Sequence, residues 1–233
     1  FREQGGQVLS IATPRGSVVY SAQRAILEGI VFDSTRRAGL PRAEVYLVGT
    51  SQSVHADERG MFQLIASLDG EYGVAFRHPR LDSLGYTPPP VTVALRSGER
   101  TAVTVGIPPE HRLVPQLCPD STLEETDRVL VGRVRDDAGR PVTGATVRVA
   151  WQTVGGTQGR PQATDWAEVV TADSAGGYVV CGLPPVLVTV SARGDAGSSP
   201  PLILRFTEDG VWIGNRYRSY PSRIWTQDIT LGR

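Results

Sequence analysis

The chain contains the same sequence pattern twice, and this repeat constrains the fold more than any other feature. The first copy runs from Leu27 to Phe62 and the second from Val129 to Tyr178. Each copy begins with an apolar segment that contains a glycine, passes a polar turn and a second apolar segment, and ends on Asp-x-x-Gly before an aromatic residue. Alternating apolar residues between Gly-, Pro- and Asp-rich turns predict short β-strands. Two copies on this scale predict two tandem β-domains rather than a solenoid of short repeats.

The closing motif keeps its internal spacing, as Asp57-x-x-Gly60-x-Phe62 in the first copy and Asp173-x-x-Gly176-x-Tyr178 in the second. The distance from the first glycine differs: Gly29 lies 28 residues (57 − 29) before Asp57, and Gly132 lies 41 residues (173 − 132) before Asp173. A Gly-rich insertion at 153–165 accounts for the difference. We interpret the motif residues as structural, because Gly permits turns and close approaches, Asp bonds turn amides, and the aromatic residue fills a core.

Charge and hydropathy exclude two classes of function. The 24 basic residues balance 24 acidic ones, whereas a nucleic-acid surface needs a basic excess to displace counterions. No apolar run is long enough to span a bilayer. All of the basic residues are Arg, so an intramolecular Lys–Asn isopeptide bond is impossible. We predict no nucleic-acid partner and no membrane span.

The two cysteines, Cys118 and Cys181, are predicted to form a disulfide, with two unrelated thiols as the alternative. The bridge would close a loop of 63 residues (181 − 118), which the loop-entropy model values at roughly 4 kcal/mol. The chain begins at Phe1, as expected after removal of a signal peptide, although trimming gives the same start. Both observations predict a periplasmic or extracellular location.

The strand signals divide the chain into four segments. Residues 1–25 are predicted to be an extended arm with short strands around a Thr13–Gly16 turn. The first domain spans 26–109, a linker spans 110–127, and the second domain spans 128–233. The only helix signal is Ser121-x-x-Glu124, which has the spacing of a capping box. The predicted strands are 26–32, 44–48, 52–56, 61–65, 72–77, 91–95, 101–107, 129–135, 146–151, 169–172, 178–181, 186–192, 202–206, 211–213 and 224–231.

Three further local structures are predicted within these domains. Residues 91–95 and 101–107 should form a hairpin around Ser97-Gly98-Glu99, and 202–206 should pair with 211–213 around a Glu-Asp-Gly turn. Residues 78–85 should be a polar loop. In the strand 101–107, Val103, Val105 and Ile107 alternate with polar residues, which indicates a half-buried strand.

The repeated pattern resembles the carboxypeptidase regulatory-like domains, also called transthyretin-like or prealbumin-like modules. It reads Gly-x-Val, Asp, a turn, Gly-x-Pro, Ala-x-Val, Asp-x-x-Gly-x-Phe/Tyr and a Leu-Pro turn, over 26–107 and 128–192. The first copy departs from it at Leu68-Asp69-Gly70, and 193–233 show no family pattern. The resemblance implies an all-β chain of two tandem seven-stranded Ig/transthyretin-like β-sandwiches, outside the cytoplasm and without catalysis by the module.

A search for catalytic, metal and cofactor motifs finds none that would make the chain an enzyme. His55, His78 and His111 lack the His-x-x-Glu spacing of a zinc peptidase, and no Gly-x-Ser-x-Gly elbow or phosphate-binding Gly-rich loop occurs. Tyr217-Arg218-Ser219-Tyr220 only partly resembles the C-terminal Tyr-Arg-Gly-Ser of transthyretin-related 5-hydroxyisourate hydrolases. The segment His78–Asp82 has a possible metal or anion ligand, but a lone His beside Pro is more often exposed or hydrogen-bonded.

The Arg- and aromatic-rich tail, Trp212–Trp225, is the feature least explained by folding. Arg and aromatic residues are enriched at interface hot spots, although the two Trp of the tail would equally cover one side of the second sandwich. Trp151 and Trp166 flank the insertion and raise the same question. The predicted partner-binding residues are Trp212, Arg216, Tyr217, Arg218, Tyr220, Arg223 and Trp225.

The function predicted from the sequence is binding rather than catalysis. The leading hypothesis is a non-catalytic, extracytoplasmic bacterial scaffolding protein, an accessory subunit docked on a larger envelope membrane complex. The alternative is a carbohydrate-binding module of the cell envelope, with exposed Trp and Tyr as stacking platforms. In either case function is expected in what departs from the repeat: the arm, the insertion and the tail.

Overall fold

A computed structural model describes residues 9–13, 16–20, 24–67, 69–155, 162–206, 210–213, 215–219 and 222–232. For 9–13, 16–20, 210–212 and 217–219 it describes the backbone alone. The fold is predominantly β, as predicted. Among the described residues, no helix has the length and apolar character needed to cross a bilayer. The chain forms two compact units: unit 1 comprises 1–33, 37–78 and 88–107, and unit 2 comprises 34–36, 79–87 and 108–233.

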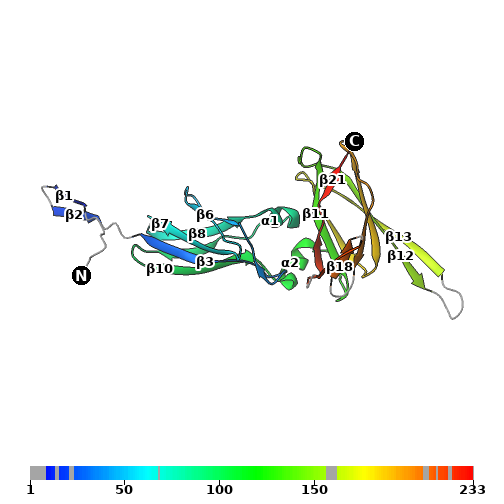
Figure 1. Ribbon diagram of the computed structural model, residues 1–233, viewed down its shortest axis with the longest axis horizontal. Coiled ribbons are helices and arrows are strands. Elements are labelled where there is room, and N and C mark those ends of the chain that lie inside the picture. Colours follow the sequence, from blue (N-terminus) through cyan, green and yellow to red (C-terminus); the bar gives the residue numbers. More distant parts are fainter. Residues whose placement is uncertain are drawn as a thin grey trace. The chain divides into compact units, whose positions relative to one another are not determined.

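Unit 1 contains two four-stranded sheets (Figure 1). The first sheet has the order β10-β3-β4, with β7 also paired to β3, and the second has the order β6-β5-β8-β9. The two sheets hold eight strands (4 + 4), so the predicted count of seven is not confirmed. A separate hairpin, β1 with β2, lies in the predicted arm. The strands are β1 Leu9–Thr13, β2 Gly16–Tyr20, β3 Ala25–Asp33, β4 Ala38–Gly39, β5 Glu44–Leu47, β6 Ser53–His55, β7 Met61–Ala66, β8 Gly70–Arg77, β9 Val91–Leu95 and β10 Arg100–Ile107.

The predicted hairpin of 91–95 with 101–107 is wrong. Strand β9 pairs with β8, whereas β10 pairs in parallel with β3, so the chain crosses from one sheet to the other between them. The reason is that both strands bury apolar side chains: Val93 and Leu95 from one sheet, and Val103, Val105 and Ile107 from the other. The predicted alternation in β10 is confirmed.

The two helices found in the described part of the chain lie where the sequence predicted none. Helix α1 (Pro79–Leu84) replaces the predicted polar loop, and α2 (Glu110–Leu117) lies in the predicted linker. Each begins at or directly after a proline, as proline suits the first helical turn, and α2 has Glu110 in its first turn, where the helix dipole favours a negative charge. Ser121–Glu124 is not helical, so that prediction is wrong.

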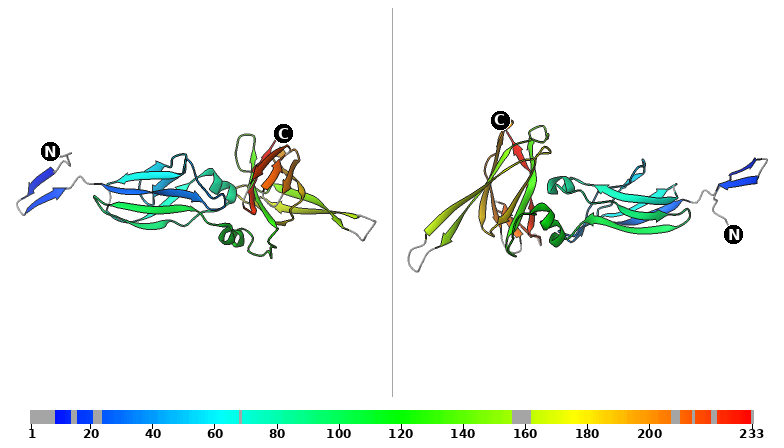
Figure 2. Two further views of the ribbon diagram at one scale, coloured as in Figure 1. Left: turned by 60° about the horizontal axis from the view of Figure 1, so that its bottom comes forward. Right: turned by 180° about the vertical axis from the view of Figure 1, so that it is seen from behind.

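Unit 2 repeats the architecture with a larger second sheet (Figures 1 and 2). Its small sheet has the order β14-β11-β20, with β21 also paired to β11. Its large sheet has the order β13-β12-β15-β17-β18-β19, with β16 beside β15. The predicted pairing of 202–206 with 211–213 is confirmed. The strands are β11 Arg128–Asp136, β12 Thr146–Gly155, β13 Gln162–Thr171, β14 Gly177–Leu183, β15 Leu187–Gly194, β16 Gly197–Ser198, β17 Leu202–Phe206, β18 Gly210–Ile213, β19 Arg216–Ser219, β20 Ile224–Thr226 and β21 Ile229–Leu231.

The repeat glycines allow the first and last strands of each sandwich to approach closely. In both units the last strand runs parallel to the first: β10 beside β3, and β20 and β21 beside β11. A Cβ at Gly29 would lie 1.9 Å from the carbonyl oxygen of Val103, and a Cβ at Gly132 would lie 1.9 Å from that of Gln227. Both glycines are therefore required by the same backbone contact.

The Asp-x-x-Gly motifs build the same turn in both copies. The Oδ1 atom of Asp57 accepts hydrogen bonds from the amides of Arg59 and Met61, each at 2.8 Å. Asp173 accepts two bonds of the same length from the equivalent amides. Gly60 and Gly176 have φ angles of 80° and 74°, which favour glycine. The interpretation of this motif as framework is confirmed.

The aromatic residue that follows each turn lies in a core, as predicted. Phe62 and Tyr178 are both buried. The hydroxyl of Tyr178 donates a hydrogen bond to the carbonyl oxygen of Gln227 at 2.5 Å. Burial, with a smaller effect from Asp228, raises the pKa of Tyr178. Cys118 follows α2 and is joined to Cys181 of β14, so the predicted disulfide is present and lies within unit 2.

Candidate binding face of the second unit

The predicted insertion is a continuation of two strands. Strands β12 and β13 pair without interruption from Thr146–Thr171 to Gly155–Gln162. Figures 1 and 2 show this hairpin projecting from the rest of unit 2. Of the predicted insertion, 153–155 and 162–165 are therefore strand, and 156–161 lie outside the described residues. The alternation of Thr, Val and Trp with polar residues suits such an extended hairpin.

The hairpin has two chemically different faces, because successive side chains of a strand point in opposite directions. On the inner face Val147 and Val149 are buried and Trp151 packs against the core. Trp166 is paired with Trp151, and its Nε1 donates a hydrogen bond to Oγ1 of Thr153 at 2.9 Å. Trp166 is half exposed because the hairpin extends past the core at this point. The outer face holds Arg148, Ala150, Gln152 and Val154, which alternate along β12 with the residues of the inner face.

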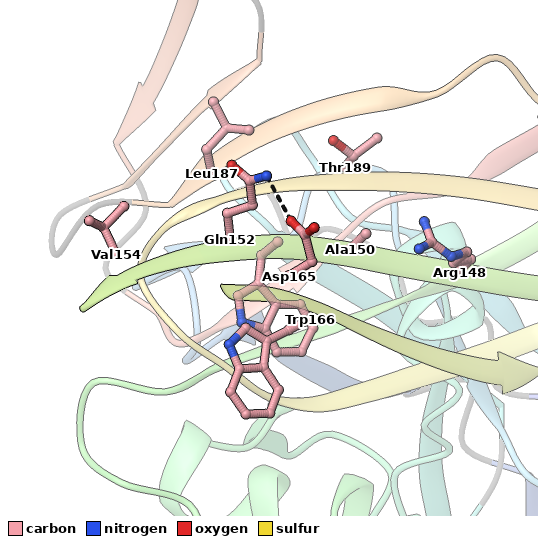
Figure 3. Close-up of a pocket in the computed structure, with 9 residues that line it drawn as sticks. Arg148, Ala150, Gln152, Val154, Asp165, Trp166, Leu187 and Thr189 are labelled. Carbon is pink, nitrogen blue, oxygen red and sulfur yellow. Dashed lines mark hydrogen bonds between the residues drawn. The ribbon is translucent and has the colours of Figure 1, made fainter. Parts of the chain in front are cut away.

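A groove of about 620 Å³ lies on β12, β13 and β15. Figure 3 shows Gln152, Asp165 and Leu187 on one side of the hairpin and Trp166 on the other. Within the groove Nε2 of Gln152 donates a hydrogen bond to Oδ1 of Asp165 at 2.7 Å. The groove therefore combines a fixed amide–carboxylate pair with aliphatic and aromatic walls. Its lining residues are Arg148, Ala150, Trp151, Gln152, Val154, Asp165, Trp166, Leu187 and Thr189.

Exposed aliphatic side chains surround the groove on the outer face. Val154 is 73% exposed, Val169 58%, and Leu187 and Ile203 51% each. We call these four residues the apolar patch. Ala167, Ala150, Thr189 and Ile203 form one row across four strands. Leu187 and Val169 lie two positions from this row and Val154 lies four, so the four members belong to one face of one sheet, which also carries Arg148, Gln152 and Asp165.

The corresponding face of unit 1 is polar. Glu44 and Arg77 occupy paired outward positions on β5 and β8 and form an ion pair with 3.5 Å between Nη1 and Oε2. The guanidinium of Arg77 also lies 4.5 Å from the centre of the Tyr46 ring. The equivalent outward positions of unit 2 include Leu187 and Ile203. The same fold thus presents a polar face in one copy and a face with large exposed aliphatic side chains in the other.

The ionisable groups of the hairpin are few. Partial burial raises the pKa of Glu168, which is paired with Val149. Among the described residues, no three His, Cys, Asp or Glu side chains are grouped as they would be around a metal ion. Arg80, of the predicted His78–Asp82 site, is buried and donates hydrogen bonds to the hydroxyls of Thr35, at 3.2 Å, and Thr226.

The structure separates the predicted residues of the tail. Trp225 is only 6% exposed and belongs to the core of unit 2, which is the alternative that the sequence left open for it. The backbone amide of Arg223 donates to Oε2 of Glu110 at 2.8 Å, and its Nη1 donates to the carbonyl oxygen of Glu124 at 2.7 Å. Arg216 is exposed on β19. Arg223 and Trp225 therefore contribute to the framework of unit 2.

The remaining tail residues are placed only through their backbone. Trp212 of β18 pairs with Arg205 and with Tyr217 of β19, and Val211 pairs with Arg218. The side chains of Trp212, Tyr217 and Arg218 are not among those described, and Tyr220 lies outside the described residues altogether. Their role in partner binding stays a prediction.

The sequence analysis did not identify the apolar patch, although a signal was present. A strand with one solvated face alternates apolar and polar residues, whereas a strand with two apolar faces reads as a continuous run. Leu187-Val188, Leu202-Ile203-Leu204 and Val169-Val170 are such runs. In each, one residue is buried or half-buried and its neighbour is exposed. These runs mark strands whose outer face includes a large exposed aliphatic side chain.

Comparisons with known proteins give only distant similarities. No protein-family model and no curated protein matches the chain. Similar solved structures include a streptococcal ancillary pilin (TM-score 0.30), the Bacillus anthracis TIE protein (0.30) and the shaft pilin SpaA of Lactobacillus rhamnosus GG (0.27), each 12% identical. The matches cover 92%, 97% and 90% of this chain, and 64%, 41% and 97% of those proteins, respectively. At these TM-scores no assignment follows, and the carboxypeptidase regulatory-like resemblance stays a prediction.

Proposed function

We propose that the chain is a non-catalytic, extracytoplasmic protein-binding module that docks on a partner protein through the outer face of the large sheet. The observation that carries this proposal is the apolar patch, whose four aliphatic side chains are each at least half exposed. Large apolar side chains that gather exposed on one face of a protein mark interaction sites. Covering it stabilises a complex by about 25 cal/mol for each Å² of apolar surface removed from water.

The arrangement of the groove favours a protein over a saccharide. In a saccharide site, an aromatic ring stacks on the sugar, and polar side chains beside that ring form hydrogen bonds with the hydroxyls of the same sugar. Trp151 and Trp166 also line the groove, but they belong to the inner row of the hairpin, whereas Gln152 and Asp165 belong to the outer row, and Nε1 of Trp166 is bonded to Thr153. The groove face instead joins the polar pair to Leu187 and Val154. Such a mixture of apolar and polar groups on one surface is typical of protein interfaces.

The disulfide supports a location outside the cytoplasm. Bridges such as Cys118–Cys181 persist in the periplasm or at the cell surface, where the environment is oxidising. In the specific form of the proposal, the partner is a larger envelope membrane complex, to which this chain is an accessory subunit. The hairpin of β1 and β2 is a sheet of two strands, and such a sheet is marginally stable alone in water. We propose this arm as a second attachment point.

The test is co-purification from native membranes in mild detergent, comparing two matched double variants. Leu187→Asp with Ile203→Asp places charge in the apolar patch. Met61→Asp with Ile65→Asp is the control, because these side chains are 48% and 53% exposed on unit 1. We expect one stoichiometric protein partner with the wild type and the control, and its loss with the patch variant. Recovery of the chain alone, equal recovery with both variants, or saturable binding on a glycan array that the patch variant abolishes would overturn the proposal.

A further inference from the structure

The large sheet of unit 2 ends in two strands that each pair on one side only within the described structure. Strand β13 pairs with β12 alone, and β19 pairs with β18 alone. Such edge strands present unpaired backbone N–H and C=O groups, which are a template for another strand. Residues 162–167 of β13 are all exposed, and Arg216 of β19 is exposed as well. Both edges are therefore open to solvent where their side chains are described.

The two edges carry opposite charge. Strand β13 contains Asp165 and Glu168 and no basic residue. Strand β19 contains Arg216 and Arg218 and no acidic residue. Opposite charges stabilise cross-strand pairs between residues on the same face of a sheet. The registers place Glu168 and Arg216 in the inner row and Asp165 in the outer row, so Glu168 is the acidic residue that can pair with Arg216, and Asp165 adds charge of the same sign to its edge. Because like charges keep edge strands apart, each edge disfavours its own copy and favours the other edge. This complementarity selects the occupant of each edge.

The strand directions also fit. Every successive pair along the path β13-β12-β15-β17-β18-β19 is antiparallel. The path holds six strands, so the first and the last run in opposite directions. A second copy shifted across the sheet would place its β19 antiparallel beside β13. The alternation of directions would then continue from one molecule to the next without a break.

We propose that the chain associates head-to-tail with a second copy of itself, the acidic edge strand β13 of one molecule pairing with the basic edge strand β19 of the next. This contact joins two different surfaces of the molecule. An assembly therefore keeps one unpaired edge at each of its ends, and arrays longer than a dimer can form. Strand β19 has four residues, which limits the ladder of hydrogen bonds and makes association weak. It is therefore concentration-dependent, and exposed charges make it sensitive to salt.

This association is separate from the docking proposed above. It uses the edges of the large sheet, whereas docking uses its outer face. Head-to-tail pairing also leaves Leu187 and Ile203 uncovered, since they lie on strands inside the sheet. A scaffold built this way would present one docking face per molecule. Failure of either proposal leaves the other standing.

The test is sedimentation velocity of the full chain over a range of protein concentrations at low and high salt. One variant reverses the acidic edge (D165R/E168R) and another reverses the basic edge (R216E/R218E). The control, E71R/E99R, changes the net charge as the acidic-edge variant does, at exposed residues of unit 1. We expect the wild type and the control to associate at low salt, and each edge variant alone to stay monomeric. An equimolar mixture of the two edge variants should associate again, because every junction is then complementary.

Two results would overturn the proposal: a wild type that stays monomeric at every concentration, or edge variants that associate alone as the wild type does. Circular dichroism checks that each variant is folded. The single reversals E168R and R216E leave the bond between Asp165 and Gln152 in place. They repeat the test with a smaller perturbation if a double variant does not fold, and they should weaken association alone and restore it when mixed.

Discussion

Replacing Gly132 by Ala tests whether the repeated motif is framework. The new Cβ would lie 1.9 Å from the carbonyl oxygen of Gln227, and real Cβ atoms stay beyond 3.0 Å, so the two segments must separate by about 1.1 Å (3.0 − 1.9). That movement would stretch the bond from the amide of Gln227 to the oxygen of Val131, now 2.8 Å, to about 3.9 Å, which is too long for a hydrogen bond. Overpacking of this kind costs about 1–3 kcal/mol, and the lost bond adds about 1 kcal/mol. We therefore expect a loss of about 2–4 kcal/mol.

Urea unfolding followed by tryptophan fluorescence measures this loss in the right part of the chain, because all four Trp lie in unit 2. Gly155→Ala is the matched control, since no atom lies within 4 Å of its added Cβ, and we expect it to be neutral or slightly stabilising. If Gly132→Ala unfolds at the same urea concentration as the control, the close approach of β11 to the last strands does not exist as described. Gly29→Ala should destabilise unit 1 for the same reason.

The remaining predictions concern unit 2. Replacing Cys118 and Cys181 by Ser should lower its free energy of unfolding by roughly 4 kcal/mol on the loop-entropy model, measured by the same urea titration. Tyr178→Phe should cost about 1–2 kcal/mol through the unpaired carbonyl of Gln227. It should also flatten the stability profile above about pH 10, because burial raises the pKa of Tyr178 and the unfolded wild type ionises first. Glu168→Gln should stabilise the protein at pH 7 and have no such effect below about pH 4, since the raised pKa of this carboxyl favours its neutral form; equal effects at both pH values would contradict this.

The framework was predictable from the sequence because each of its elements has a local cause. Alternating apolar residues placed most of the strands to within a few positions, and the turn of Asp57 and its twin at Asp173 followed from the residue types alone. The pairing of β9 and β10 was not predictable, because both strands bury the same kind of side chain and only the partner sheet distinguishes a hairpin from a crossover. Proline signals for α1 and α2 were present at Pro79 and Pro109, but α2 has no side-chain cap, and α1 follows His78, which is not one of the Ser, Thr, Asp or Asn residues that usually mark a helix start.

The candidate binding face was only partly predictable. Aromatic and Arg residues drew attention to the tail, but Trp225 lies in the core, because aromatic side chains suit an interior as well as an interface. Leu187 and Ile203 are inconspicuous in the sequence, since an apolar run does not reveal which of its members faces solvent. The insertion was correctly identified as a departure from the repeat, and the structure shows it to be an extension of the sheet.

The most direct test of the central claim is photo-cross-linking from the apolar patch in intact cell envelopes. A photoreactive residue at Ile203 should give one dominant protein adduct, and the same residue at Ile65, which is equally exposed on unit 1, should not. Adding Leu187→Asp should reduce the Ile203 adduct at least tenfold, whereas adding Met61→Asp should leave it unchanged. Equal adducts from both positions, an adduct that is insensitive to Leu187→Asp, or no protein adduct from Ile203 would contradict the account.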